Sequence, residues 1–291
     1  MIMWLASYPK SGNTWMRALL SCYLFDQYHD ENQDVFSKMK IIKSFPKKFA
    51  FKGIVDENYL IKNKLGAYKY FIKAQEKINK DPNLHIIKTH NFCGSSNGYE
   101  FTNKQNTIGS IYIVRDPRDV AVSYASFADI SYKESVSLLF NDNRISFNDK
   151  YYPEARLSWK THLISWLSFP APRLIVRYED LLKNTEGILR STIIFINQFL
   201  NNKITVDEDK ITRVVSECDF NKLKYLENKK GFDENEDWLD ETKKKLFKNS
   251  NKQKRFFRKG KEKSWENVLP ESLIKQIENN FSKEMKKLNY I

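Results

Sequence analysis

Cysteine is scarce in this sequence: the 291 residues include three, and none of them belongs to a Cys-x-x-Cys pair. Because Cys22, Cys93 and Cys218 are odd in number and far apart, they predict neither a disulfide framework nor a zinc site. The four histidines include no pair at the helical spacing typical of metal ligands. We therefore expect a protein without a metal, in a reducing compartment such as the cytoplasm.

Long apolar runs are also missing. No stretch approaches the roughly 20 apolar residues that span a bilayer, and the N-terminus lacks the basic leader and small-residue cleavage site of a signal peptide. Neither a repeat nor a low-complexity linker interrupts the chain. The sequence therefore predicts a cytoplasmic protein with no transmembrane segment, and its length suits a single domain over residues 1–291.

Acidic residues are outnumbered by basic ones, 36 to 49, which gives a formal charge of +13. This excess favours anionic partners, and nucleotides, RNA and anionic membranes all qualify. Much of it lies in residues 243–263, where Glu262 is the only acid. We expect most of these side chains to form a solvated face, with Arg258, Lys259 and Gly260 as the exception.

Apolar runs typical of strands alternate along the chain with helical patterns. This alternation predicts an α/β fold: a single P-loop-like domain with a central parallel sheet flanked by helices on both faces. Strands are expected over residues 2–8, 84–88, 108–114 and 173–177. Helices are expected over residues 14–25, 117–127, 151–167 and 187–200, with loops and short helices in 26–81 and a polar, helical tail.

A phosphate-binding loop is predicted directly after the first strand, in residues 8–15 (Tyr-Pro-Lys-Ser-Gly-Asn-Thr-Trp). Gly12 lets the backbone turn closely around an anion, and the N–H groups and dipole of the following helix point at it. Lys10 adds a charge. In a nucleotide kinase or ATPase the lysine follows the glycine, with a hydroxyl beside it that holds magnesium. Here the lysine comes first; the alternative is an ordinary strand-turn-helix with a solvated lysine.

Polar side chains follow the carboxyl ends of four predicted strands: Lys10, His90, Arg115 and Tyr178. In an open parallel sheet these ends border the ligand crevice, so we expect the four to converge. Arg115 and Ser123, two turns into the next helix, are suited to grip one phosphate. The alternative for Arg115 is an ion pair, for example with Asp119.

Several of these motifs occur together in one family. The loop over residues 8–15 resembles the 5′-phosphosulfate loop of sulfotransferases that use 3′-phosphoadenosine 5′-phosphosulfate (PAPS), and residues 111–124 look like the family's second signature, which holds the 3′-phosphate. Residues 88–90 are similar to its Lys-Thr-His strand end, residues 177–180 to its Tyr-Glu-Asp, and residues 257–260 to its C-terminal Arg-Lys-Gly loop. The resemblance departs at Lys263, where the family usually has a second glycine, and in the lack of a visible dimerisation pattern.

The resemblance implies sulfuryl transfer from PAPS to a hydroxyl or amine of a small-molecule, sugar or lipid acceptor. His90 is the implied base, Lys10 would stabilise charge on the leaving phosphate in place of a metal, and Lys88 would contact the sulfuryl group. The residues implied in donor binding are Lys10, Ser11, Gly12, Asn13, Thr14, Trp15, Arg115, Ser123, Tyr178, Cys218, Phe220, Arg258, Lys259 and Gly260.

Two other classes remain open at this point. A P-loop phosphotransferase is the nearer, because residues 111–116 also resemble an apolar strand that ends in a magnesium-binding Asp. An RNA-binding protein is the other, because Phe256 and Phe257 are interleaved with the basic residues of 252–263; no RNA-binding motif accompanies them, so we expect no nucleic acid partner. Aromatic residues that either line an acceptor pocket or belong to the core are Tyr23, Tyr28, Phe36, Phe45, Tyr68, Tyr99 and Phe140.

Overall fold

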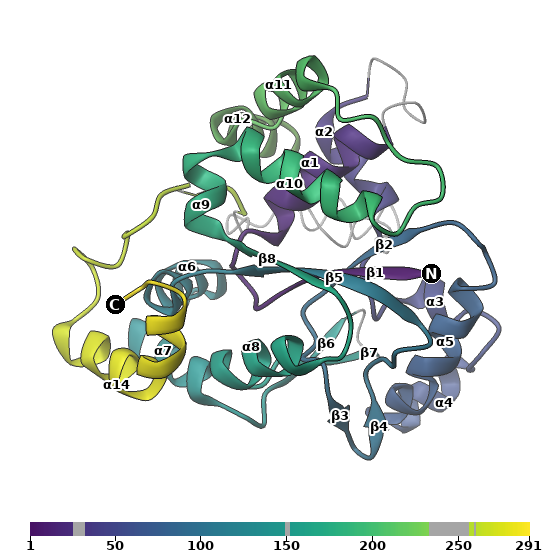
Figure 1. Ribbon diagram of the computed structural model, residues 1–291. Helices are drawn as coiled ribbons and strands as arrows, with labels where there is room; N and C mark the ends of the chain where they lie inside the picture. Colours follow the sequence, from purple (N-terminus) through teal and green to yellow (C-terminus); the bar gives the residue numbers. More distant parts are fainter. Residues whose placement is uncertain (26–32, 149–151, 233–255, 259) are drawn as a thin grey trace.

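The computed structural model describes residues 1–25, 33–148, 152–232, 256–258 and 260–291. Its centre is a four-stranded parallel sheet in the order β2-β1-β5-β8 (Figure 1). The strands are β1 (Ile2–Ser7), β2 (His85–Thr89), β5 (Thr107–Val114) and β8 (Arg173–Arg177). The four strands predicted from the sequence are therefore confirmed, and with them the α/β class.

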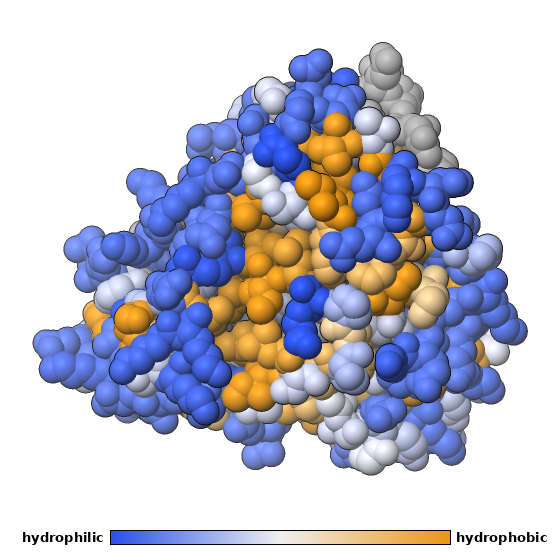
Figure 2. All heavy atoms as spheres, in the orientation of Figure 1, coloured by the Kyte–Doolittle hydropathy of each residue, from blue (hydrophilic) through white to orange (hydrophobic). Residues whose placement is uncertain are grey.

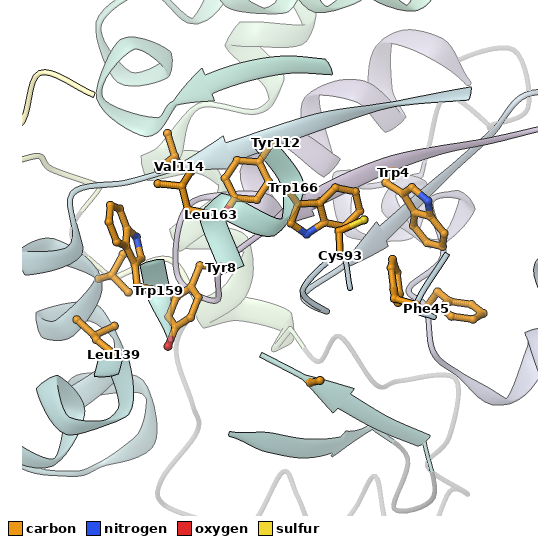
Figure 3. Packing of buried hydrophobic residues seen from close by; sticks show 14 of the residues in the cluster. Trp4, Tyr8, Phe45, Cys93, Tyr112, Val114, Leu139, Trp159, Leu163 and Trp166 are labelled. Carbon is orange, nitrogen blue, oxygen red and sulfur yellow. The ribbon is translucent and has the colours of Figure 1, made fainter. Parts of the chain in front are cut away.

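The two faces of the sheet are covered by separate sets of helices, because side chains alternate along each strand. In β1, Trp4 and Ala6 belong to one apolar cluster, and Met3 and Leu5 belong to the other. Figure 3 shows part of the first cluster, in which Trp4 and the aromatic side chains of later elements pack beneath the strands.

Helices α1, α2, α9, α10, α11 and α12 lie on one side of the sheet, and α3, α4, α5, α7, α8 and α14 lie on the other (Figure 1). The bounds of the first set are Asn13–Leu24, Val35–Lys38, Tyr178–Lys183, Thr185–Asn197, Glu208–Glu217 and Phe220–Lys230. Those of the second are Lys48–Phe51, Glu57–Lys62, Phe71–Ile78, Tyr132–Phe140, Trp159–Ser168 and Glu271–Lys287. Two 3₁₀ turns, Met39–Ile41 and Gly66–Tyr70, complete the segment of short helices expected between residues 26 and 81.

Helix α6 (Pro117–Ala128) begins where the sequence predicts. The Asp116 carboxylate accepts a hydrogen bond from the backbone N–H of Arg118, and Pro117 occupies the first helical position, where no N–H is needed. The cap fixes the N-terminus of α6 at the carboxyl end of β5. This is the place at which a phosphate site was predicted.

The helix predicted over residues 151–167 is wrong in its first part. Tyr152–Ala155 forms strand β7, which pairs antiparallel with β6 (Ile145–Asn148). The second residue of β7 is Pro153, which cannot donate to a helical ladder. The helix starts at Trp159 instead, because the Ser158 hydroxyl accepts a hydrogen bond from the Thr161 backbone and caps it. A second short hairpin, β3 (Ser95–Ser96) with β4 (Tyr99–Glu100), lies in the loop after β2.

Strand β8 is one of the two edge strands of the sheet, and apolar side chains gather over the middle of the face that carries it (Figure 2). This strand and the helices α8 and α10 on either side of it carry the exposed residues Ile175, Ile164 and Ile194, respectively. Within the described part of the chain, no helix combines the length and the apolar character needed to cross a membrane.

Candidate active site

The loop between β1 and α1 has a left-handed backbone at two positions, which strains Lys10 but not the glycine. Gly12 has φ of 100° and Lys10 has φ of 70°, both in the left-handed region. A Cβ atom on Gly12 would lie 2.5 Å from the ring of Tyr178, so only glycine fits here. The Asn13 side chain donates to the Leu5 carbonyl at 3.0 Å and fastens the loop to β1. Such strain is typical of ligand-binding turns.

The Ser11 hydroxyl is buried in this loop and has no hydrogen-bond partner among the described residues. A buried polar group without a partner is costly, and it is found where a ligand or water completes the site. Together with the N-terminus of α1, this hydroxyl makes the predicted loop suited to an anion.

A cavity of about 160 Å³ lies at the carboxyl ends of β1 and β2. Lys10, Lys88 and His90, the three residues predicted to be catalytic, all line it. The Lys10 ammonium lies 4.0 Å from the ring centre of Phe127 and 5.0 Å from that of Phe256. The complete wall consists of Pro9, Lys10, Ser44, Lys47, Lys88, Thr89, His90, Tyr124, Phe127, Glu154, Arg156 and Phe256.

The aromatic residues considered for an acceptor pocket lie elsewhere. Tyr23, Phe36, Phe45 and Tyr68 are buried in the core, and Tyr99 is 42% exposed. Phe140 packs partly buried against the core, and Tyr28 is outside the described residues. The cavity takes its aromatic side chains, Tyr124, Phe127 and Phe256, from α6 and from the segment after residue 255, and the sequence analysis assigned none of them to an acceptor pocket.

The orientation of the His90 ring follows from its hydrogen bonds. Its Nδ1 lies 2.8 Å from the carbonyl oxygen of Ser7. Because a carbonyl only accepts, Nδ1 carries the proton and Nε2 carries the lone pair. His90 therefore holds the tautomer that a base acting through Nε2 requires.

A second histidine, His162, supports His90 from the core. The His162 Nε2 donates to the His90 carbonyl at 3.2 Å, and its Nδ1 accepts from the Tyr112 hydroxyl at 2.9 Å. Burial lowers the pKa of His162 to about 3, so the ring stays neutral. Sequence reasoning missed this residue, since a lone histidine on a helix gives no signal of its own.

His162→Gln is expected to flatten the pH dependence of stability. Between pH 5 and 6.5 the unfolded chain protonates His162, whose usual pKa is 6.5, whereas the folded chain does not. Stability therefore rises with pH in this window, by up to about 1.4 kcal/mol per pH unit for one proton. Glutamine keeps a donor and an acceptor but does not titrate. Urea unfolding of both proteins across the window measures the two slopes, and parallel slopes would contradict the prediction.

Glu154 and Arg156 form a buried ion pair in the cavity wall. The Arg156 Nε and Nη2 lie 2.7 and 2.6 Å from the same Glu154 carboxylate oxygen. Burial alone would raise the pKa of Glu154, but the charges of Arg156 and Lys88 outweigh it and lower the pKa to about 2. Glu154 is therefore a carboxylate at neutral pH.

At the carboxyl end of β5, the charge of Arg115 acts on a second arginine, Arg258. Arg115 donates to the backbone carbonyls of Lys10 at 3.3 Å and Lys261 at 3.0 Å, and its guanidinium carbon lies 4.2 Å from the centre of the Tyr178 ring. Burial and the like charge of Arg115 lower the pKa of Arg258. Arg115 also lies 3.8 Å from Asp119, so the alternative ion pair is present as well.

The remaining residues predicted for the phosphate site are placed as follows. Ser123 lies on α6, two turns after the helix begins, and is half-buried. Gly260 has φ of 59°, and a Cβ there would lie 2.6 Å from the Phe220 ring. Lys263, at the position where sulfotransferases usually have glycine, has φ of 55°. Lys259 lies outside the described residues.

Trp15 and Cys218 also meet, although 203 positions separate them in the sequence. The Trp15 indole N–H donates to the Cys218 carbonyl at 2.9 Å, and the Trp15 ring meets Tyr178 edge-on at 6.2 Å. The Phe220 ring lies 5.8 Å from that of Phe257. Thr14 follows in the first turn of α1.

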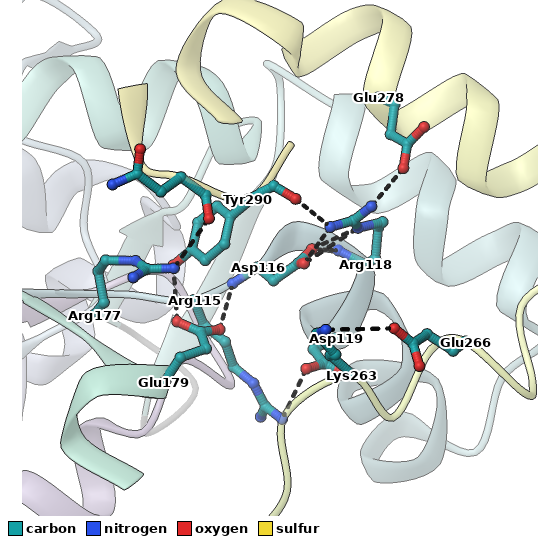
Figure 4. Close-up of polar contacts among 11 residues, drawn as sticks. Arg115, Asp116, Arg118, Asp119, Arg177, Glu179, Lys263, Glu266, Glu278 and Tyr290 are labelled. Carbon is teal, nitrogen blue, oxygen red and sulfur yellow. Dashed lines mark hydrogen bonds and ion pairs between the residues drawn. The ribbon is translucent and has the colours of Figure 1, made fainter. Parts of the chain in front are cut away.

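A polar network holds the start of α6 in place (Figure 4). One Glu179 carboxylate oxygen accepts from the Asp116 backbone N–H at 3.1 Å, and the other accepts from the Tyr290 hydroxyl at 3.0 Å. Arg118 binds Asp116, the Tyr290 carbonyl and Glu278. The Tyr-Glu-Asp residues directly follow β8 and form the first turn of α9, and Glu179 ties the C-terminus to the start of α6. No group of three or more metal-ligating side chains occurs among the described residues.

Comparison with known proteins gives one consistent result. Residues 2–289 match the family model of the sulfotransferase domain. Flavonol 3-sulfotransferase of Flaveria bidentis is 26% identical over 284 residues, which cover 95% of this chain and 79% of that protein. Sulfotransferase 1B1 of Mus musculus is 26% identical over 230 residues, 76% of this chain and 64% of that protein.

Solved structures confirm the fold. A mouse sulfotransferase, SULT7A1, complexed with PAP (adenosine 3′,5′-bisphosphate) superposes with a TM-score of 0.60 at 20% identity, over 98% of this chain and 84% of that one. Retinol dehydratase in a complex with retinol and PAP gives a TM-score of 0.61 at 20% identity, over 98% of this chain and 81% of that one. Both have the parallel-sheet architecture predicted here.

Proposed function

The chain belongs to the sulfotransferase domain family, and we propose that it transfers a sulfuryl group from PAPS to a hydroxyl or amine of an acceptor, releasing adenosine 3′,5′-bisphosphate. One observation carries the proposal. Lys10 and His90, from two neighbouring strand ends, line the same cavity, and Arg115, just before α6, donates to the Lys10 carbonyl and is near enough for its charge to lower the pKa of Arg258. A transfer site next to an anion site is what this reaction needs.

The β1–α1 loop fits the 5′ end of the donor. Ser11 offers a buried hydroxyl, Gly12 leaves room for close backbone approach, and Asn13 and Thr14 open the helix whose N–H groups face an anion. We propose that the adenine is bordered by Trp15, Tyr178, Cys218 and Phe220. PAPS supplies the sulfuryl group, whose bond to the bridging phosphate oxygen breaks as the new bond from sulfur to the oxygen or nitrogen of the acceptor forms.

His90 and two lysines are proposed to carry the chemistry. The His90 Nε2 takes the proton of the acceptor as the acceptor attacks sulfur. Lys10 stabilises the negative charge that grows on the leaving phosphate, and Lys88 binds oxygens of the group in transfer. Two lysine side chains thus neutralise charge that other phosphate enzymes meet with magnesium.

Arg115→Ala is expected to abolish recognition of the 3′-phosphate. We propose that this phosphate is surrounded by Arg115, Ser123, Arg258, Lys259 and Gly260. Each charged hydrogen bond that is left unmade costs roughly 1.5 to 3 kcal/mol of binding free energy. Adenosine 3′,5′-bisphosphate should therefore bind wild type at least tenfold (about 1.4 kcal/mol) more tightly than 5′-AMP. Calorimetry with both ligands on wild type and Arg115→Ala measures the ratio of the two affinities in each protein.

An arginine away from the site serves as the control for this prediction. Arg190 is paired with Glu208 on the surface, so Arg190→Ala should keep the full margin between the two nucleotides. Equal affinities on the wild-type protein would mean that it has no 3′-phosphate site. The proposed donor would then be wrong.

The function itself is tested by incubating the protein with PAPS and a phenol such as 4-nitrophenol. Mass spectrometry should detect a product heavier by one SO₃ group, and EDTA should leave the rate unchanged. Magnesium-dependent transfer from ATP would instead favour the phosphotransferase alternative. Binding of single-stranded RNA that is not competed by adenosine 3′,5′-bisphosphate would favour the RNA-binding alternative.

We also infer a cytoplasmic location, because Cys22, Cys93 and Cys218 are buried and form no disulfide.

A further inference from the structure

The segment that begins at Phe256 passes both halves of the proposed site. Phe256 lines the transfer cavity, and the centre of its ring lies 5.0 Å from the Lys10 ammonium. Two positions later, Arg258 is close enough to Arg115 for the charge of Arg115 to lower its pKa. The Lys261 carbonyl then accepts a hydrogen bond from Arg115 at 3.0 Å. The path of this segment therefore decides where one wall of the cavity and one cation of the phosphate site lie.

Residues 256–258 belong to neither a helix nor a strand, so no regular ladder of hydrogen bonds fixes this path. Glu227, on α12, supplies an anchor. One of its carboxylate oxygens accepts from the Phe256 backbone N–H at 2.7 Å, and the other accepts from the Phe257 backbone N–H at 3.0 Å. Because the two N–H groups are successive and the acceptor is charged, these bonds are strong and fix the direction of the backbone as well as its position.

The glutamate stands at a place where an apolar side chain would also pack. Glu227 is only 2% exposed, which is rare for this residue type, because burial penalises the charged form. Aromatic rings already pack against the same segment: Phe36 stacks on Phe257 at 5.9 Å, and Phe232 meets Phe256 edge-on at 5.1 Å. These rings fill space around the segment, whereas the carboxylate binds its backbone at two defined atoms.

We propose that Glu227 is a positioning residue of the donor site. By holding the N–H groups of Phe256 and Phe257, it places Arg258 for the 3′-phosphate and the Phe256 ring beside the Lys10 ammonium. It acts through the backbone of this segment, since its carboxylate is turned toward that backbone. The inference rests on the proposed sulfotransferase function and deepens it.

Glu227→Gln is expected to weaken recognition of the 3′-phosphate. Glutamine fills the same space, but its amide offers one oxygen, and its NH₂ group faces the second backbone N–H without accepting from it. The ratio of affinities for adenosine 3′,5′-bisphosphate and 5′-AMP should therefore fall by about tenfold, the effect of one hydrogen bond to a charged group. Calorimetry measures this ratio, and the KM for PAPS should rise with its loss.

Glu284→Gln is the matched control. Glu284 is also a buried glutamate of a helix, α14, and it lies beside Lys160. Its replacement removes the same charge and should keep the wild-type ratio. Because each result is a ratio within one protein, a variant that is merely less stable does not imitate the effect.

Hydrogen exchange tests the contact in the wild-type protein, without a ligand or a substitution. The backbone N–H groups of Phe256 and Phe257 should exchange much more slowly than in an unfolded chain, because both are bonded to a buried carboxylate. In Glu227→Gln they should exchange faster, while those of α10 keep their rates. Exchange of both groups at the unfolded-chain rate in the wild-type protein would overturn the inference, whether or not the variant folds.

The outcomes separate this inference from the function on which it rests. If adenosine 3′,5′-bisphosphate binds and sulfonated products form, but Glu227→Gln keeps the wild-type ratio, Glu227 is not a positioning residue and the proposed function stands. Failure of the wild-type protein to bind adenosine 3′,5′-bisphosphate, with no product from any acceptor, overturns the proposed function and this inference together.

Discussion

Replacement of His90 by alanine is expected to lower kcat by about 10²- to 10⁴-fold, the usual contribution of a general base. The Ser7 carbonyl fixes the proton of this ring on Nδ1, so that Nε2 is the basic nitrogen of a side chain in the cavity wall. Removal of the ring leaves the β1–α1 loop and the β5–α6 site in place. Affinity for adenosine 3′,5′-bisphosphate should therefore stay within a few-fold of wild type.

The same strand offers a matched control. His85 lies at the other end of β2, beside Asp81 and away from the cavity, so His85→Ala should keep kcat near wild type. Steady-state rates with saturating PAPS and calorimetry of the bisphosphate give the two quantities needed. A His90→Ala protein that turns over at nearly the wild-type rate would show that His90 is structural.

The donor side of the site could be predicted from sequence because its signals are local. Gly12, Asp116 and Pro117 each specify a turn or a helix start within a few residues, and apolar runs mark the strands before them. Parallel strands then bring their carboxyl ends together without further information. This is why Lys10, His90 and Arg115 converge as expected.

The acceptor side could not be predicted in the same way, because its contacts join distant segments. Lys47 reaches the cavity only because its segment pairs with β2, and Glu154 only because residues 152–155 form a strand instead of the predicted helix. His162 acts through a backbone carbonyl 72 positions away. These placements depend on contacts between distant segments, which cannot be predicted from the periodicity or spacing of residues in the sequence.

Loss of the Lys10 ammonium is expected to lower kcat by about 10²- to 10³-fold, as for other groups that stabilise developing charge. The ammonium lies against the rings of Phe127 and Phe256, which keep water from one side of it and so strengthen its effect on the leaving phosphate. Turnover at saturating PAPS isolates this contribution from donor binding.

The backbone at Lys10 makes a sharper experiment possible. At φ of 70°, alanine keeps the strain of the native loop while glycine relieves it, yet both remove the charge. If charge stabilisation is the cause, kcat falls by the same factor in Lys10→Ala and Lys10→Gly. In the control Lys133→Ala, which replaces an exposed lysine, kcat should stay at the wild-type value. If loop geometry is the cause, the glycine variant behaves differently from the alanine variant. Equal losses in both would therefore assign the effect to the ammonium and support metal-free transfer at this loop.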